Sequence, residues 1–253
     1  VTEIVNKYGK VIVIEDDIVT SKNFLKFMND ALNYYEEEKK VWHIGAHTMV
    51  NDTDKENLVF FWKVMTCWGW ATWSDRWQHY EKNPDNLLNT FSKEQIKEFN
   101  LYDSARFWHQ VIENKLGLID TWAIFWHATI FRNKGYCLNP YFSYVENIGL
   151  DGTGVNSGRY KKLMQGQKVN KNGIFKPLVP VQEDMFQIKR LKNFYSKNKR
   201  YNQFKLFVKR FMPKSLISTI KNFDYKIDFV NGKKSLKING NIFDTNYIFK
   251  YTI

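Results

Sequence analysis

The chain has 253 residues and a net charge of +12, and 43% of its residues are hydrophobic, which is typical of a globular protein with one substantial domain and an additional segment. Two cysteines, Cys67 and Cys137, exclude a disulfide framework and lie in no zinc-ligand pattern, so a reducing compartment is expected. No apolar run reaches about 18 residues, which excludes a membrane-spanning helix of ordinary length.

The N-terminal part of the chain predicts alternating helix and strand. Residues 3–9 are expected to end a helix at a glycine, and Val11–Ile14 is a β-branched apolar run typical of a strand. Apolar residues at helical spacing predict a helix over Asn23–Lys39, and Val41–Ile44 predicts the next strand. Together they predict a right-handed β-α-β unit with two parallel strands.

The middle of the chain predicts more helix. Val59–Trp62 is typical of a strand, and residues 92–116 carry two helical patterns, the first opened by Ser92. A third helix is predicted over Trp122–Asn133, and Leu138–Val145 is expected to be extended.

Positive charge is concentrated in the last part of the chain. Residues 1–158 hold 16 Lys and Arg against 21 Asp and Glu, whereas residues 159–253 hold 22 against 5. We expect a linker at 159–182, basic amphipathic helices at 183–223 and a small β-rich segment at 224–253. The helices either bind an anionic membrane surface or pack their apolar side on the body. Nucleic acid is not an expected partner, because no binding motif accompanies the charge.

Three consecutive carboxylates, Glu15, Asp16 and Asp17, follow the first predicted strand. Like charges in a row repel, and their burial is costly unless a cation or strong donors compensate. A hard divalent cation at the carboxyl edge of a sheet would compensate them, whereas a solvated acidic turn would need no ligand. The residues themselves leave both interpretations open.

Two later segments stand out in composition. Residues 67–77 read CWGWATWSDRW, which suits either a sugar-binding pocket wall or an aromatic core cluster. Residues 140–158 read PYFSYVENIGLDGTGVNSG, and their four glycines among Asp and Asn indicate a mobile loop.

Together these three segments resemble bacterial glycosyltransferases of the GT-A fold that carry EDD and CWGWATW motifs, and more distantly N-acetylglucosaminyltransferase type I. The resemblance covers about residues 1–158 and implies part of a Rossmann-like α/β domain with a mixed sheet. In that family, β-α units that bind the nucleotide precede the acidic motif, and here only one helix and one strand precede it. We therefore expect a chain that lacks the front of the domain and binds donor weakly by itself.

The resemblance also implies residue roles. Asp17 would hold Mn²⁺ or Mg²⁺ against the two phosphates of a nucleotide-sugar, with Glu15 and Asp16 at the ribose or donor sugar. Asp120 would be the base of an inverting transfer. The alternative is that Asp120 only caps the helix that follows it. Further substrate contacts are implied at Trp68, Gly69, Trp70, Asn147, Gly149, Asp151 and Asn156, the last standing where His is expected. Asp151, Glu146 and Asp75 are the alternatives for the base.

The function that the resemblance implies is transfer of a sugar from a nucleotide-diphosphate donor to a glycan or lipid-linked acceptor in surface polysaccharide synthesis. Such an enzyme would be cytoplasmic and peripheral on the inner membrane face. The alternative is a non-catalytic membrane-surface or interaction module, inactive because the nucleotide-binding half is absent.

Overall fold

A computed structural model describes residues 1–55, 57–149, 168–172 and 175–196, together with the backbone of 226–230, 233–238 and 241–244. The chain forms two compact units, residues 1–199 and residues 200–253.

The first unit is built on a five-stranded sheet with the strand order β1-β5-β3-β6-β4. The strands are β1 (Lys10–Val13), β3 (Val41–Gly45), β4 (Val59–Trp62), β5 (Trp70–Trp73) and β6 (Tyr136–Pro140). Strands β3 and β6 pair in parallel, and the other neighbouring pairs are antiparallel. The chain is therefore a mixed α/β protein, as expected from the sequence.

The two strands of the predicted β-α-β unit are parallel, with a further strand between them. Strands β1 and β3 both run antiparallel to β5, so they point the same way, as a β-α-β unit requires. However, β5 lies between them, and they are not hydrogen-bonded neighbours. The sequence predicts no strand at Trp70–Trp73, because these residues form neither an apolar run nor a clear alternation of apolar and polar side chains.

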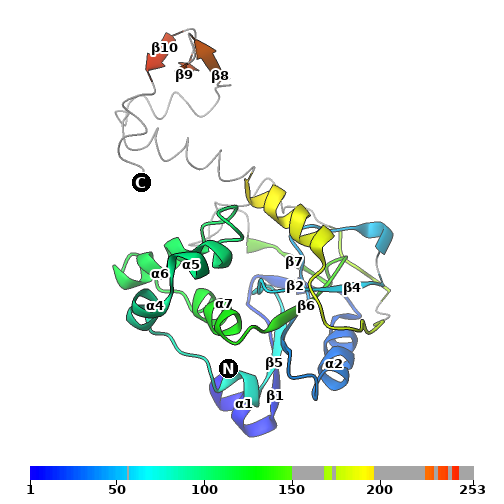
Figure 1. Cartoon of the computed structure of the whole chain (residues 1–253). Helices are drawn as coiled ribbons and strands as arrows, with labels where there is room; N and C mark the ends of the chain where they lie inside the picture. Colours follow the sequence, from blue (N-terminus) through cyan, green and yellow to red (C-terminus); the bar gives the residue numbers. More distant parts are fainter. Residues whose placement is uncertain are drawn as a thin grey trace. The chain divides into compact units, whose positions relative to one another are not determined.

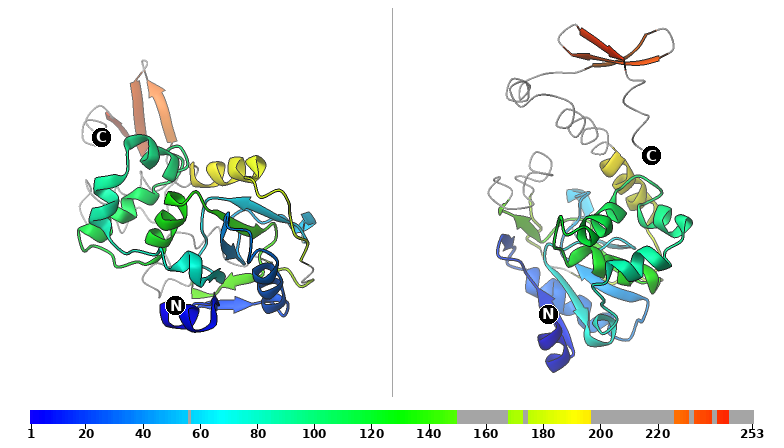
Figure 2. Two further views of the ribbon diagram at one scale, coloured as in Figure 1. Left: turned by 60° about the horizontal axis from the view of Figure 1, so that its bottom comes forward. Right: turned by 90° about the vertical axis from the view of Figure 1, so that its left-hand side faces the viewer.

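Helices cover both faces of this sheet (Figures 1 and 2). Helix α2 (Phe24–Tyr34) packs on one face and α7 (Ala123–Arg132) on the other. Residues 185–196 are also helical, and Ile188 and Leu191 from this segment are buried on the α7 side. The remaining helices are α1 (Thr2–Tyr8), α3 (Ser74–Trp77), α4 (Pro84–Thr90), α5 (Lys93–Phe99) and α6 (Phe107–Lys115), with a 3₁₀ turn η1 at Thr53–Lys55.

Alternation of side chains along the strands fills both cores. In β4, Phe61 packs on the α2 side, whereas Phe60 and Trp62 pack on the α7 side. Each of these rings is at most 1% exposed, and burial of such a side chain contributes about 2–3 kcal/mol. A third cluster joins α7 to α4, α5 and α6.

Local chemistry explains where several helices begin and end. The Ser92 hydroxyl accepts a hydrogen bond from Gln95 N–H, and the Gln95 side chain accepts one from Ser92 N–H, so a capping box opens α5. Helix α1 ends at Gly9 with a φ of 79°, as predicted. Helix α2 ends at Tyr34 rather than Lys39, because the buried guanidinium of Arg76 binds backbone carbonyls beyond that point, with 2.7 Å to that of Glu36.

The predicted linker at 159–182 is in part outside the described residues. Its described end is packed on the body, because Phe175 and Val181 contact the α2-side core and the Tyr35 hydroxyl bonds to the backbone of Leu178. Of the helices predicted at 183–223, the described residues 185–196 likewise pack on the body, and the rest lies outside the described part.

The second unit contains a three-stranded antiparallel meander. Its strands are β8 (Lys226–Val230), β9 (Lys233–Ile238) and β10 (Asn241–Asp244), in the order β10-β9-β8. These strands lie within the range 224–253, for which the sequence predicts a small β-rich segment. In the parts of both units that the structure describes, no helix is long and apolar enough to cross a bilayer.

Candidate functional site

The three carboxylates lie where β1 turns into a short second ribbon. Asp16 and Asp17 form a turn after β1, and β2 (Ile18–Thr20) follows at once. Strand β2 pairs antiparallel with β7 (Val145–Asn147), with Ile18 opposite Asn147. The predicted acidic motif and the predicted loop segment are therefore brought together across 130 residues of sequence.

Asp17 is the most constrained of the three carboxylates. Its Oδ2 accepts a hydrogen bond of 3.0 Å from Asn147 Nδ2, and its backbone carbonyl accepts one of 2.9 Å from Ile148 N–H. A Cβ at Gly149 would lie 2.7 Å from Asp17 Oδ2, so this close approach requires glycine. Asp17 Oδ1 is buried and has no hydrogen-bond partner among the described residues.

A divalent cation fits this arrangement. Within residues 1–55, 57–149 and the later described stretches, no three His, Cys, Asp or Glu side chains converge into a complete metal cage. Mg²⁺ does not need such a cage, because it is commonly held by one or two carboxylates together with substrate phosphates and water. A buried carboxylate oxygen without a donor is costly, and a cation at Asp17 Oδ1 would remove that cost.

Glu15 lies beside Asp17 but faces an aromatic wall. Burial, and then the charges of Asp17 and Asp16, raise the pKa of Glu15, while a hydrogen bond from the Trp122 side chain opposes this shift. Burial and next the charge of Glu15 raise the pKa of the Cys67 thiol to about 12, so the aromatic segment begins next to the carboxylates. The sequence did not single out Trp122 as a site residue, although it stands two residues after Asp120.

A cavity of about 280 Å³ opens beside Glu15. Its wall is mainly aromatic, and the rings of Trp77 and Tyr80 stack there with centroids 4.5 Å apart. The lining residues are Val1, Thr2, Val13, Glu15, Trp70, Trp77, Tyr80 and Trp122. Flat ring faces next to a carboxylate suit a ligand that carries both a ring and hydroxyl groups.

The structure places the Trp-Gly-Trp residues mainly in the interior. The Trp70 ring is fully buried and stacks on His43 and on Trp122, with centroid distances of 5.5 and 5.1 Å. Because the Trp70 ring stacks on two protein side chains, Trp70 supports the cavity wall by packing behind it. The half-buried ring of Trp68 lies 4.4 Å from that of His47.

Gly69 is explained by backbone conformation and packing. Its φ is 65°, and a Cβ there would lie 3.0 Å from the Phe24 ring and 3.1 Å from Val145 Cγ1. A close approach to the α2-side core therefore accounts for glycine here, and the substrate contact implied at Gly69 stays a prediction.

Asp120 is near the cavity but not inside it. Its side chain is 89% exposed and forms an ion pair with Lys82. Burial and next the charge of Asp120 raise the pKa of Tyr80, a cavity residue, to about 12. Asp120 does not cap α7, whose N-cap is Trp122, so the helix-cap explanation is wrong.

The alternatives for the base differ in their surroundings. Burial by itself would raise the pKa of Asp75, but hydrogen bonds from Arg76 and Lys39 outweigh it and lower that pKa. Asp75 also follows Trp73, which pairs with Lys10 at the start of β1, so it lies at the end of the sheet away from Asp17. Glu146 neighbours Asn147 on β7 and therefore points to the opposite face of that strand. Asp151 and Asn156 lie outside the described residues.

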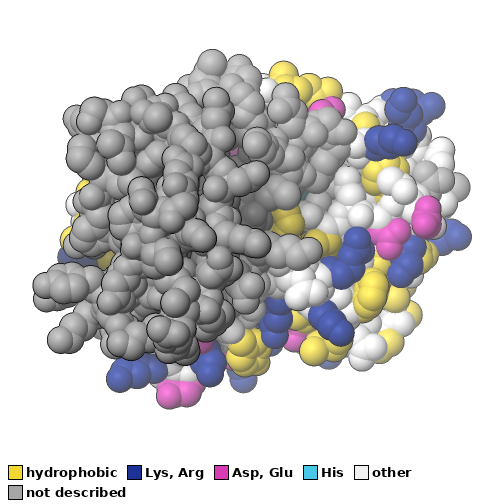
Figure 3. Space-filling model, turned by 90° about the horizontal axis from the view of Figure 1, so that it is seen from above, with side chains coloured by type: hydrophobic (Ala, Val, Ile, Leu, Met, Phe, Trp, Pro, Cys, Tyr) yellow, Lys and Arg dark blue, Asp and Glu magenta, His cyan; other side chains and the backbone are white. Residues whose placement is uncertain are grey.

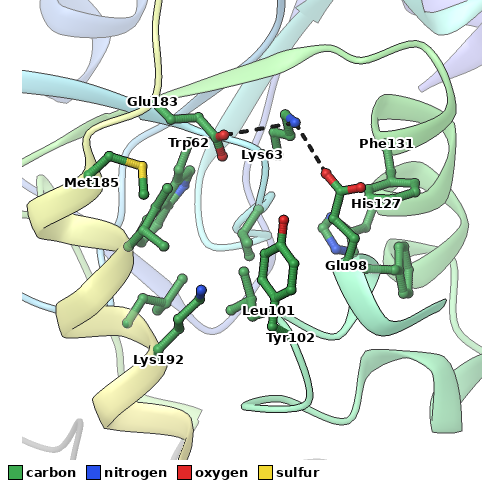
Figure 4. Close-up of a pocket in the computed structure, with 14 residues that line it drawn as sticks. Trp62, Lys63, Glu98, Leu101, Tyr102, His127, Phe131, Glu183, Met185 and Lys192 are labelled. Atoms are coloured by element: carbon green, nitrogen blue, oxygen red, sulfur yellow. Dashed lines mark hydrogen bonds and ion pairs between the residues drawn. The ribbon is translucent and has the colours of Figure 1, made fainter. Parts of the chain in front are cut away.

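A second, smaller cavity of about 100 Å³ lies near the end of β4 (Figure 4). The Lys63 ammonium lies 3.4 Å from a Glu98 oxygen and 3.8 Å from a Glu183 oxygen. Burial by itself would lower the pKa of Lys63, but the charges of Glu183 and Glu98 outweigh it and raise that pKa. Lys63 thus bridges two carboxylates and ties the segment before the 185–196 helix to α5. Since β4 runs opposite to β1, this cavity is at the other end of the sheet from Asp17.

Comparison with known proteins adds no relative. No protein-family model matches the chain, and no curated protein matches it significantly. The candidate site therefore depends on its geometry and on the resemblance of its motifs.

Proposed function

We propose that the chain is part of an inverting, metal-dependent glycosyltransferase that uses a nucleotide-diphosphate sugar donor and a glycan or lipid-linked acceptor. The observation that carries the proposal is the buried, unpartnered Oδ1 of Asp17 at the carboxyl end of β1, next to an aromatic cavity. The resemblance of the three sequence motifs to GT-A transferases supports the same function. A cytoplasmic site at the inner membrane face would give access to a lipid-linked acceptor.

Asp17 is the residue that would hold Mn²⁺ or Mg²⁺. The cation supplies positive charge against the charge that develops on a departing diphosphate. Asn147 keeps the Asp17 carboxylate in place, and Gly149 leaves room for it. Glu15, held by Trp122, is positioned to accept hydrogen bonds from sugar hydroxyls at the cavity mouth.

Asp120 is the proposed base. In an inverting transfer the acceptor hydroxyl loses its proton as its oxygen attacks the sugar, and the bond from the sugar to the diphosphate breaks. Asp120 would accept that proton after its carboxylate leaves Lys82, which is feasible because the pair is exposed. Tyr80 and Trp122 border the cavity close to this carboxylate.

Turnover of nucleotide-sugars by the full chain tests the proposal. Nucleoside diphosphate release is measured over a panel of donors with Mn²⁺ or with a chelator. Asp17→Asn is expected to lower turnover by about 100-fold or more through loss of electrostatic stabilisation. Asp120→Asn is expected to lower kcat by about 100-fold with little change in Mn²⁺ dependence, as for a general base.

Matched controls come from two carboxylates in other ion pairs. Asp30 pairs with Lys26 on α2, and Asp85 pairs with Lys115 from α4 to α6. Asp30→Asn and Asp85→Asn should leave turnover unchanged, because neither residue lines the cavity. Because the chain is expected to bind donor weakly, each donor is tested up to millimolar concentration. Equal turnover in all four variants would refute the assigned roles, and no release from any donor at that concentration would refute the transferase proposal.

The alternative, an interaction module at a membrane surface, is favoured by the excess of basic residues after position 158. The visible face of the described body carries Lys and Arg interspersed with Asp, Glu and apolar side chains (Figure 3). A membrane role would therefore depend on the basic segment rather than on this face of the body.

A further inference from the structure

Asn147 is a buried polar residue with an incomplete set of hydrogen bonds. It ends β7, opposite Ile18 of β2, and is 8% exposed. Its Nδ2 donates to Asp17 Oδ2 at 3.0 Å, so the amide is directed at the acidic turn. Its Oδ1 is buried and finds no donor in the part of the chain that the structure describes.

Asp17 also has one buried oxygen without a hydrogen bond. Oδ2 accepts from Asn147, and Oδ1 is buried without a donor. Two neighbouring side chains thus each hold one buried, unpaired oxygen. Such atoms cost about 1–3 kcal/mol each when nothing compensates them, and native structures contain few of them.

The backbone fixes these two side chains relative to each other. Ile148 N–H donates to the Asp17 carbonyl at 2.9 Å, and the β2–β7 pairing holds Asn147 beside the acidic turn. Gly149 lies against the Asp17 side chain, where a Cβ would be 2.9 Å from Asp17 Cβ. The two oxygens are therefore held by strand pairing and not by flexible side chains alone.

We propose that Asn147 is a direct metal ligand, so that Oδ1 of Asn147 and Oδ1 of Asp17 together bind the divalent cation. This inference rests on the proposed function and adds a protein ligand from a second strand. Carboxylate and amide oxygens are hard ligands, which favour Mn²⁺ or Mg²⁺ over Zn²⁺. The amide nitrogen orients Asp17, and the amide oxygen completes the pair of ligands.

The alternative role for Asn147 is orientation of Asp17 through its N–H alone. Asn147→Asp separates the two roles, because it removes the N–H donor and keeps an oxygen at the same place. Asn147→Leu removes both groups at similar volume. Asn133→Asp is the matched control, since Asn133 caps α7 just before the start of β6, at the end of the sheet away from Asp17.

The experiment is a Mn²⁺ titration of the full chain followed by electron paramagnetic resonance, with thermal unfolding in Mn²⁺ and in EDTA. We expect Asn147→Leu to weaken Mn²⁺ binding about tenfold or more. Asn147→Asp should bind Mn²⁺ at least as tightly as the wild type. It should also unfold at lower temperature in EDTA, because two carboxylates then face each other, and gain more from Mn²⁺.

The other outcomes would separately refute the ligand role of Asn147, the metal site or the transferase proposal. If Asn147→Asp binds Mn²⁺ as poorly as Asn147→Leu, or if neither differs from wild type, the ligand role of Asn147 is overturned while the metal at Asp17 stands. If the wild type binds no Mn²⁺, or Asp17→Asn binds it normally, the metal site itself is overturned. If the Mn²⁺ series behaves as expected but no nucleotide-sugar is turned over even at millimolar concentration, the transferase proposal fails and the ligand assignment holds.

Discussion

His43 shows how a buried polar residue is stabilised in this core. The His43 ring is fully buried, accepts a hydrogen bond at Nδ1 from Trp126 Nε1–H at 3.2 Å, and places Nε2 3.1 Å from the Thr66 carbonyl. Because a carbonyl only accepts, Nε2 carries the proton and the ring is neutral. Burial is the largest cause that lowers the pKa of His43 to about 3.

This pKa predicts acid sensitivity. Below the ordinary value of 6.5 the unfolded chain takes up a proton that the native ring excludes, so stability falls as pH falls towards about 3. The slope is up to about 1.4 kcal/mol per pH unit for each such histidine. His43→Gln can make the same two hydrogen bonds without titrating, so its free energy of unfolding should fall less steeply in acid. Urea unfolding at several pH values measures this slope.

The control for this variant is His79→Gln. His79 is exposed, so this variant makes the same substitution without altering a buried ring. His127, whose pKa burial also lowers to about 3, stays in both variants and keeps part of the slope. Identical slopes in wild type and His43→Gln would contradict the prediction.

Among the elements, the connection from β4 to β5 is the one whose sequence was most open to two interpretations. Its aromatic segment suits either a ligand wall or a core, and the structure turns Gly69 towards α2 and β7. The chain has a useful comparison in Gly117, which has a φ of 66° but would have no atom within 4 Å of a Cβ. The two glycines share a left-handed backbone conformation, which would strain any other residue, and differ in packing.

Gly69→Ala and Gly117→Ala should therefore have different costs. Gly117→Ala is expected to lower the free energy of unfolding by about 1 kcal/mol from the left-handed backbone alone. Gly69→Ala adds overlap with Phe24 and Val145, for a total of about 2–4 kcal/mol. Chemical denaturation measures both values. Equal costs would mean that the contacts around Gly69 yield without penalty.

Over the whole molecule, charge is the least evenly distributed property. The excess of 17 positive charges after residue 158 stands against a deficit of 5 before it. The described residues 185–196 use Ile188 and Leu191 to pack on the body, so those side chains are not available to a membrane. An anionic surface would attract the basic segment electrostatically, and salt screens that attraction.

We expect the full chain to co-sediment with phosphatidylserine-containing vesicles at low salt and to be released at high salt. Neutral phosphatidylcholine vesicles should not retain it. Replacing Lys205, Lys209 and Arg210 by Gln should weaken binding by about 100-fold, because each basic residue near the surface contributes about 1 kcal/mol. Replacing three exposed body lysines, Lys22, Lys93 and Lys97, is the control. Retention by neutral vesicles at high salt would refute this electrostatic model.

The sequence was informative where the signal is local. Gly9 and Ser92 mark a helix end and a helix start because caps act within a few residues. The run Val11–Ile14 predicted β1 within one residue, and helical spacing predicted α2 and α7. Strands β2 and β5 were missed. Each has only three or four residues, and strand pairing holds it in place, which no local pattern reveals.

The site divides in the same way. The sequence by itself determined that three carboxylates follow a strand and that an aromatic segment and a glycine-rich one come later. Only the tertiary structure decided that Trp70 is interior, that Trp122 holds Glu15, and that Asn147 reaches Asp17. The physical reason is that burial and hydrogen bonding between residues 130 positions apart depend on strand pairing and packing, which no local pattern of residues specifies.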